Sequence, residues 1–219
     1  MYDKPKDIFN LIKNAIRGDI KNGNLAFLLL TSKSEHYIRD KVALKLYREL
    51  TKKGFLISRE WASEELKREW GSKKAKIDLA ILTKIGKPKV FIEFKLNTVA
   101  GSIPGFKDDI KKDFGKLNQG SIKKAHRFVV FMSLLPDKPI NERFRGIVKY
   151  WGGFNKFFKN TCNGDLKKGI KVVIKSIRGL GDKIRKNSGE YDEIIEPSPA
   201  GKFYNETNLW FIFWVLNLK

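Results

Sequence analysis

The sequence is poor in the residues that build disulfides and thiolate metal sites. Among 219 residues there is one Cys, Cys162, and there are two His. A lone Cys cannot close an internal disulfide, and structural zinc sites take four ligands drawn mainly from Cys and His. The sequence therefore excludes a disulfide framework and a zinc finger. A reducing compartment is the natural home of such a chain, so we expect a cytoplasmic protein.

Long apolar runs are also absent. The runs at 25–30 and 210–216 are much shorter than the roughly 20 residues that a membrane-spanning helix needs. We therefore expect no membrane partner. Hydrophobic residues nevertheless make up 42% of the chain, which is enough to form a core rather than a disordered segment. At this length we expect one domain over 1–219.

Negative charge is scarce relative to positive charge. Lys and Arg number 45 against 24 Asp and Glu, which gives a net charge of +21. Such an excess attracts polyanions and makes their binding steeply dependent on salt. A solvated lysine-rich surface with no binding role is the alternative. The balance favours nucleic acid as partner, although charge does not separate DNA from RNA.

The order of secondary structure can be predicted from apolar periodicity. Helical spacing predicts helices over 7–20, from Ser34 to the glycine stop at Gly54, and over 107–117. A short apolar segment begins at Leu25, and 63–76 is either a short helix or a loop. Strands are predicted at 55–61, 77–83, 89–96 and 128–135, with a tight turn at Gly86 joining the second and third. Beyond Pro139 we expect a helix over 142–158, a strand over 170–177, a basic loop and a terminal strand over 210–216.

Two carboxylates and a lysine fall on the predicted central hairpin. Side chains alternate along a strand, so Glu93 and Lys95 share one face while Phe94 turns to the other, and the partner strand brings Asp78 alongside. Charges in such apolar runs must pair with each other or with a metal. Asp78, Glu93 and the Phe94 carbonyl offer hard oxygen ligands for Mg²⁺, and Lys95 suits an attacking water or the charge of a phosphoryl transition state.

Asp78 followed after fourteen residues by Glu93-Phe94-Lys95 resembles the PD-(D/E)xK nuclease superfamily, which includes most restriction endonucleases and archaeal Holliday junction resolvases. The resemblance covers about residues 34–135, including a preceding helix that often carries another acid. Glu35 is the best candidate for that acid, ahead of Asp40 and Glu60. Ile77 stands where the motif commonly has proline, which weakens the match as a string.

The resemblance implies an α/β fold with a mixed central sheet flanked by helices. Residues 34–135 would form a restriction endonuclease-like core, 1–33 an N-terminal helical extension, and 136–219 a C-terminal part that contains β-structure. It also implies an Mg²⁺-dependent endonuclease, with Mn²⁺ able to substitute, that acts on double-stranded DNA. The basic, aromatic-rich C-terminal part favours a type II restriction enzyme, either a homodimer or a monomer. A junction resolvase, another structure-specific nuclease and a non-catalytic DNA-binding module are the alternatives.

Two basic segments of the C-terminal part are candidates for contacts with DNA. Arg and Asn are the natural readers of guanine and adenine edges, although solvated loops that contact phosphates alone are an equal alternative. Gly179 and Gly181 do not follow a strand-to-helix turn, so no nucleotide cofactor is expected. The candidate contacts are Arg143, Arg145, Arg178, Lys183, Arg185 and Asn187.

Overall fold

The computed structural model describes residues 2–32, 35–71, 75–97, 107–118, 120, 122, 124–188 and 190–219. Ser34, where the second predicted helix begins, lies outside these residues. The helices and strands are α1 (Pro5–Lys21), α2 (Asn24–Thr31), α3 (Glu35–Leu50), the 3-10 helix η1 (Thr51–Lys53), β1 (Phe55–Trp61), α4 (Glu64–Glu69), β2 (Ile77–Thr83), β3 (Pro88–Asn97), α5 (Lys107–Leu117), β4 (His126–Pro136), the 3-10 helix η3 (Glu142–Phe144), α6 (Trp151–Phe157), the π-helix η4 (Phe158–Cys162), α7 (Leu166–Ser188), β5 (Tyr191–Phe203) and β6 (Thr207–Leu218).

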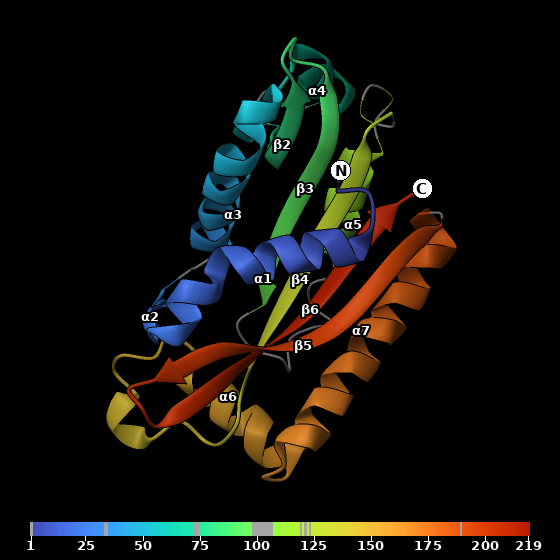
Figure 1. The fold of residues 1–219 in the computed structure, drawn as a ribbon. Helices are drawn as coiled ribbons and strands as arrows, with labels where there is room; N and C mark the ends of the chain where they lie inside the picture. Colours follow the sequence, from blue (N-terminus) through green and yellow to red (C-terminus); the bar gives the residue numbers. More distant parts are fainter. Residues whose placement is uncertain are drawn as a thin grey trace.

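A six-stranded mixed sheet organises the fold, in the order β1-β2-β3-β4-β6-β5. β3 and β4 are parallel and the other neighbours are antiparallel. Figure 1 shows α1 crossing one face of the sheet, with α7 running along its other side. The protein is therefore an α/β fold with a mixed sheet flanked by helices, as predicted.

The core consists of two apolar layers separated by the sheet. One layer packs α1, α2 and α3 against the sheet, and the other packs α4, α5, η4 and α7 against the opposite face. Along β4, Val130 and Met132 belong to the first layer, whereas Val129 and Phe131 belong to the second. The strand predicted at 128–135 is therefore present as β4, and its continuous apolar run is buried on both faces.

The predicted strand over 170–177 and the predicted basic loop after it are both wrong, because these residues form the single helix α7. The β-branched run Val172-Val173-Ile174 imitates a strand over a short window. Over a longer window the buried residues recur every three or four positions, which is a helical period. These buried residues are Val173, Ile177, Leu180 and Ile184. In the described part of the chain, neither α7 nor any other helix is long and apolar enough to cross a membrane.

Two further differences concern the C-terminal part. The predicted helix over 142–158 is divided into η3 and α6 by the turn residues 145–150, which include Gly146. The predicted terminal strand is longer than expected, and its partner β5 was missed because Pro197 and Pro199 argue against a strand. β5 lies at the edge of the sheet, where a missing backbone N–H is tolerated.

The C-terminal part completes the central sheet. β6 pairs with β4 from Leu209 to Leu218, and β5 pairs with β6 along its length. The packing of α7 against this half of the sheet also explains a glycine inside a helix. A Cβ on Gly181 would lie 2.7 Å from the Tyr191 hydroxyl and 3.2 Å from the Trp214 ring. Residues 136–219 are thus structural partners of the core strands.

Arg127, at the start of β4, links the ends of α5 and β6 through hydrogen bonds. Its guanidinium is buried and donates hydrogen bonds to the Leu117 carbonyl (3.3 Å) and Asn118 Oδ1 (2.8 Å) at the end of α5. It also donates to the Leu218 carbonyl (3.4 Å) and the Lys219 carbonyl (2.7 Å) at the end of β6. Burial lowers the pKa of Arg127. One side chain therefore ties α5 to two strands.

Replacing Arg127 by Met should lower the free energy of unfolding by about 2 kcal/mol, because buried carbonyl groups lose their donors. Urea denaturation followed by circular dichroism measures this. Arg178→Met, which changes an exposed side chain of α7, is the matched control and should stay within about 0.5 kcal/mol of the parent. Equal stability of the two variants would contradict the assigned role of Arg127.

Candidate active site

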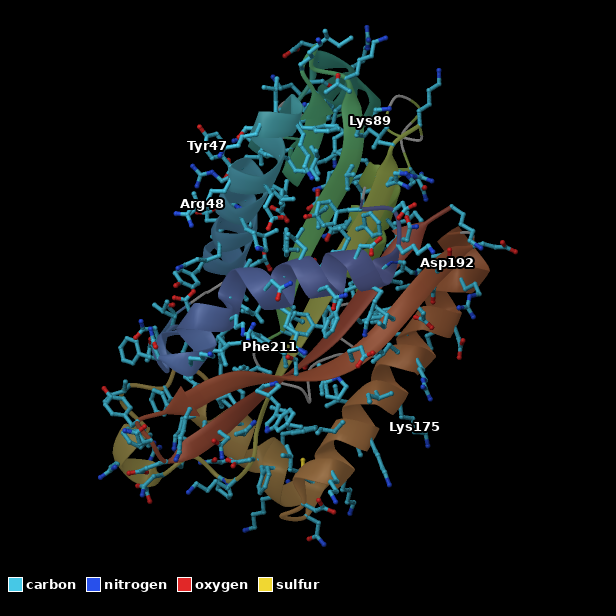
Figure 2. The ribbon with its side chains drawn as sticks, in the orientation of Figure 1. Tyr47, Arg48, Lys89, Lys175, Asp192 and Phe211 are labelled. Carbon is cyan, nitrogen blue, oxygen red and sulfur yellow. The ribbon has the colours of Figure 1, made fainter. Side chains whose placement is uncertain are left out.

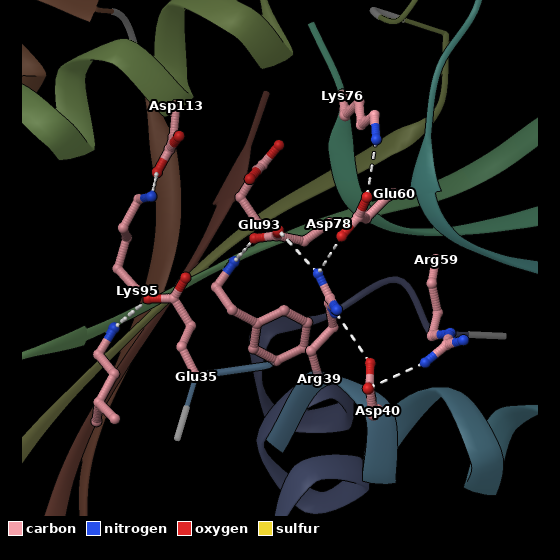
Figure 3. Close-up of polar contacts among 12 residues, drawn as sticks. Glu35, Arg39, Asp40, Arg59, Glu60, Lys76, Asp78, Glu93, Lys95 and Asp113 are labelled. Carbon is pink, nitrogen blue, oxygen red and sulfur yellow. Dashed lines mark hydrogen bonds and ion pairs between the residues drawn. The ribbon is translucent and has the colours of Figure 1, made fainter. Parts of the chain in front are cut away.

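The site begins where β2 and β3 separate. Leu79 and Ile92 are the last residues that pair across the two strands in the described chain, whereas β3 continues alongside β4 as far as Asn97. Beyond that point two carboxylates, rather than a neighbouring strand, accept the hydrogen bonds of the β3 backbone. The Phe94 N–H donates to Asp78 Oδ2 at 2.8 Å, and the Leu96 N–H donates to Glu35 Oε2 at 2.9 Å (Figure 3). Backbone donors thus fix both acids along one strand edge.

The side chains of Glu93 and Lys95 point to the face of β3 that α5 covers. Phe94 lies between them in the sequence and packs into the opposite layer with α1, α2 and α3. Lys95 Nζ is 3.4 Å from Asp113 Oδ2, and Glu93, which is only 2% exposed, forms an ion pair with Lys116. The predicted alternation along β3 is therefore confirmed.

Asp113 and Lys116 are members of this cluster that the sequence analysis missed. Both project from α5, and Lys116 Nζ also contacts the Lys76 carbonyl at 2.8 Å and Asp113 Oδ1 at 3.8 Å. A signal was present in the sequence. Asp113 shares the helical face of the buried Ile110 and Phe114, and a carboxylate on an apolar face needs a partner.

A second buried cation, Arg39 of α3, borders the cluster on the side of β1. Arg39 contacts Asp40 Oδ1 at 3.1 Å, Glu60 Oε1 at 3.4 Å and Asp78 Oδ1 at 3.8 Å. Asp40 also pairs with Arg59, and Glu60 with Lys76 (Figure 3). Of the three acids considered for the preceding helix, Glu35 therefore binds the β3 edge, whereas Asp40 and Glu60 hold Arg39.

Burial is the main cause that raises the pKa values of Glu35, Glu93 and Asp113. Burial and then the nearby charge of Asp78 raise the pKa of Glu93 well above its usual range, against the opposing effect of Lys116. Burial raises the pKa of Asp113 to about 6 and also raises that of Glu35. Burial by itself would lower the pKa of Lys95, but four surrounding carboxylates raise it. The site therefore holds negative charge at an energetic cost.

The described cluster carries one more negative than positive charge when all its groups are ionised. Its acids are Glu35, Asp78, Glu93 and Asp113, and its cations are Arg39, Lys95 and Lys116. A divalent cation together with one phosphodiester, which carries a single negative charge, would balance this excess. The charge of the cluster is thus suited to a metal-bound phosphate group.

Asp78, Glu93 and the Phe94 carbonyl are the oxygen donors available to such a cation. The N–H and C=O of one strand residue point to the same neighbour, so the Phe94 carbonyl faces the Asp78 side of β3. Within the described ranges, no three His, Cys, Asp or Glu side chains are arranged to hold a metal. Mg²⁺ does not require that, since it commonly takes one or two carboxylates and fills its other positions with water and phosphate oxygens. The donors present fit Mg²⁺.

The candidate DNA contacts lie on η3, on the turn that follows it and on α7. Arg143 of η3 pairs with Glu206 and lies 4.7 Å from the Phe144 ring, and Arg145 lies 5.6 Å from the Trp151 ring. Arg178, Lys183 and Arg185 are exposed on α7, on the opposite side of the sheet from α1. The side chain of Asn187 lies outside the described residues. The structure thus brings Asp78, Glu93, Lys95 and Glu35 together.

No protein-family model, no curated protein and no solved structure matches this chain. The function is therefore inferred from the chemistry of the residues that the fold brings together.

Replacing Asp113 by Asn should raise the melting temperature at pH 7.5 by a few degrees. Burial raises the pKa of Asp113 from 3.8, the value of an exposed side chain, to about 6, so the folded protein holds this proton more tightly than the unfolded chain. The resulting stabilisation is full below about pH 4 and is lost as the pH rises through about 6. Asn avoids the loss, so the two proteins should melt alike near pH 4. Melting curves followed by circular dichroism over this range measure the difference.

Asp109→Asn is the control for this experiment, because Asp109 is an exposed carboxylate on the same helix. Its melting temperature should follow the parent at every pH. A parent protein that is more stable than Asp113→Asn at pH 7.5 would mean that the ion pairs with Lys95 and Lys116 outweigh the cost of burial.

Proposed function

We propose that this protein is an Mg²⁺-dependent DNA endonuclease of the PD-(D/E)xK type, with Asp78, Glu93 and Lys95 as its catalytic residues. The observation that carries the proposal is the free edge of β3. There the Asp78 carboxylate of β2 accepts a hydrogen bond from the Phe94 N–H. Phe94 lies in the sequence between Glu93 and Lys95, whose side chains point toward α5. The arrangement agrees with what the resemblance implies for a restriction endonuclease-like core.

In this proposal Asp78, Glu93 and the Phe94 carbonyl hold Mg²⁺. When bound, Mg²⁺ polarises the phosphate and lowers the pKa of a coordinated water. The hydrogen bond from the Phe94 N–H orients Asp78 before any ligand arrives, which reduces the entropy that binding must remove. Burial of Glu93 excludes bulk water from the inner side of the site.

Lys95 is best suited to act as a fixed ammonium group. The surrounding carboxylates raise its pKa, so it stays protonated at neutral pH and donates hydrogen bonds to a phosphate oxygen or to the attacking water. Asp113 positions its Nζ from α5 at 3.4 Å. Glu35 acts through the backbone of Leu96 and holds the start of α3 against the strand that carries Lys95.

DNA is proposed as the substrate because the net charge of +21 favours a polyanion. The same catalytic residues would serve a type II restriction enzyme or a structure-specific nuclease. The sequence favours the restriction enzyme because the basic, aromatic-rich residues 136–219 are long enough to contain elements that read bases. In the fold those residues supply β5 and β6 to the central sheet and α7 to one of its faces, so this argument for a restriction enzyme is weaker. Plasmid, duplex and four-way junction substrates should therefore be compared.

The parent protein should cut DNA in Mg²⁺ or Mn²⁺, and Asp78→Asn, Glu93→Gln and Lys95→Ala should each lose at least about 100-fold in rate. Asn and Gln keep the shape and an acceptor oxygen but lose the charge. Gel analysis of a sequenced plasmid and of a labelled four-way junction, with sequencing of the product ends, measures rate and specificity. Discrete ends at one short motif would indicate a restriction enzyme, whereas preferential cutting of the junction would indicate a structure-specific nuclease.

Glu64→Gln is the control, because the Glu64 side chain on α4 is 89% exposed, and it should cut like the parent. Cleavage that survives Asp78→Asn would refute the assigned site. A parent protein that binds DNA but cuts none of the substrates in either metal would instead be a non-catalytic DNA-binding module.

A further inference from the structure

A basic groove lies between α1 and the tip of the β5–β6 hairpin, away from the β3 edge. It consists of two adjoining hollows of about 450 and 430 Å³, which share Ile20 and Lys21 in their linings. We call it the α1–hairpin groove and define it by Lys13, Arg17, Lys21, Phe27, Lys202 and Tyr204. In Figure 1 the α1–α2 corner approaches the end of the hairpin.

Two glycines allow the walls of the groove to meet. Gly23 links α1 to α2 with a φ of +71°, and a Cβ there would lie 3.0 Å from the Lys202 carbonyl. Gly201 has a φ of +111° at a bulge in β5, and its Cβ would lie 3.1 Å from the Ile20 carbonyl. A side chain at either position would strain the positive φ and would require the neighbouring backbone to shift by a few tenths of an ångström. The groove is therefore a built feature of the fold.

The groove is cationic along its length. Lys13, Arg17 and Lys21 are spaced four residues apart on α1, so they form one exposed row with a positive charge about every 6 Å. Lys202 of β5 lines the same hollow as Lys21, at the end of this row. Among the residues described, none of these four cations pairs with a carboxylate, and the linings of the two hollows include no Asp or Glu. The charges are thus available to an anionic chain.

Two exposed aromatic rings stand at the hairpin end of the groove. Tyr204 is 53% exposed and Phe27 is 43% exposed, with ring centroids 6.2 Å apart. The Tyr204 ring also stacks on Phe144 at 5.1 Å. Tyr204 has a φ of +46°, which is strained for a bulky side chain. The fold therefore holds a half-exposed ring in the same hollow as Lys21 and Lys202, at the cost of backbone strain.

We propose that the α1–hairpin groove binds single-stranded DNA, with phosphates along Lys13, Arg17 and Lys21 and bases stacked at Tyr204 and Phe27. Exposed rings offer little to a duplex, whose bases are already stacked, but they bind every unpaired base through its π-face. The inference rests on the proposed function and deepens it. The substrate would be DNA that contains an unpaired segment, which favours the structure-specific nuclease over the restriction enzyme.

Fluorescence anisotropy in EDTA tests the groove without cleavage, with labelled 20-nucleotide strands of DNA and RNA and a blunt duplex as probes. Lys13→Gln/Arg17→Gln/Lys21→Gln should weaken binding of the DNA strand about tenfold, and the slope of log affinity against log salt should fall by about 2, because each phosphate contact contributes about 0.7 for single strands. Tyr204→Ser should weaken it about tenfold as well, whereas Tyr204→Phe should bind like the parent because it keeps the ring.

Lys167→Gln/Lys171→Gln/Lys175→Gln is the matched control. It removes the same charge at the same spacing from the exposed face of α7, where Lys175 points into solvent (Figure 2). If both triple variants weaken binding equally, overall charge explains the affinity and the groove is refuted. It is also refuted if Tyr204→Ser weakens duplex binding as much as strand binding, or if the RNA strand binds more tightly than the DNA strand.

The two proposals can fail separately. A chain that cuts no DNA but binds the DNA strand through the groove would overturn the proposed nuclease and leave the groove assignment standing. A chain that cuts DNA in Mg²⁺ while the triple variant of the groove binds like the parent would do the reverse.

Discussion

The separation of β2 from β3 after the Leu79–Ile92 pair is the constraint on which the site depends. A sheet that opens leaves backbone donors without a neighbouring strand, and buried donors must be satisfied. Here Asp78 and Glu35 accept those hydrogen bonds, so the same geometry that completes the backbone of β3 also fixes two carboxylates. Glu93 and Lys95, which alternate with Phe94 and Leu96 along the strand, then project toward α5. Local sheet geometry thus organises the charged cluster.

The cluster is costly for stability and valuable for chemistry. Burial and mutual repulsion raise the pKa values of Glu93 and Asp113, which means that ionising them works against folding. Burial of the two apolar layers and the hydrogen bonds of Arg127 to the end of α5 offset this loss of stability. A divalent cation would relieve the repulsion between these carboxylates. The proposed metal would therefore explain why the fold keeps them together. Lys116 meanwhile forms an ion pair with Glu93 and offsets part of its negative charge.

Much of the site could be predicted because strand alternation is local. The spacing of Glu93, Phe94 and Lys95 fixes their faces, and the hairpin brings Asp78 close. Asp113 and Lys116 come from α5 and Arg39 comes from α3, so their position beside β3 depends on the packing of these helices. The failures in the fold have physical causes: the β-branched run Val172-Val173-Ile174 imitates a strand inside α7, and two prolines conceal the edge strand β5. The groove joins segments about 180 residues apart, a distance over which periodicity carries no information.

The most direct test of the central claim is the position of a bound metal. Crystals soaked in Mn²⁺ and measured near the manganese absorption edge should show an anomalous peak ligated by Asp78, Glu93 and the Phe94 carbonyl, and crystals of Asp78→Asn should lack it. A peak held by other residues would contradict the account. So would an empty cluster at a Mn²⁺ concentration that supports cleavage of DNA in solution.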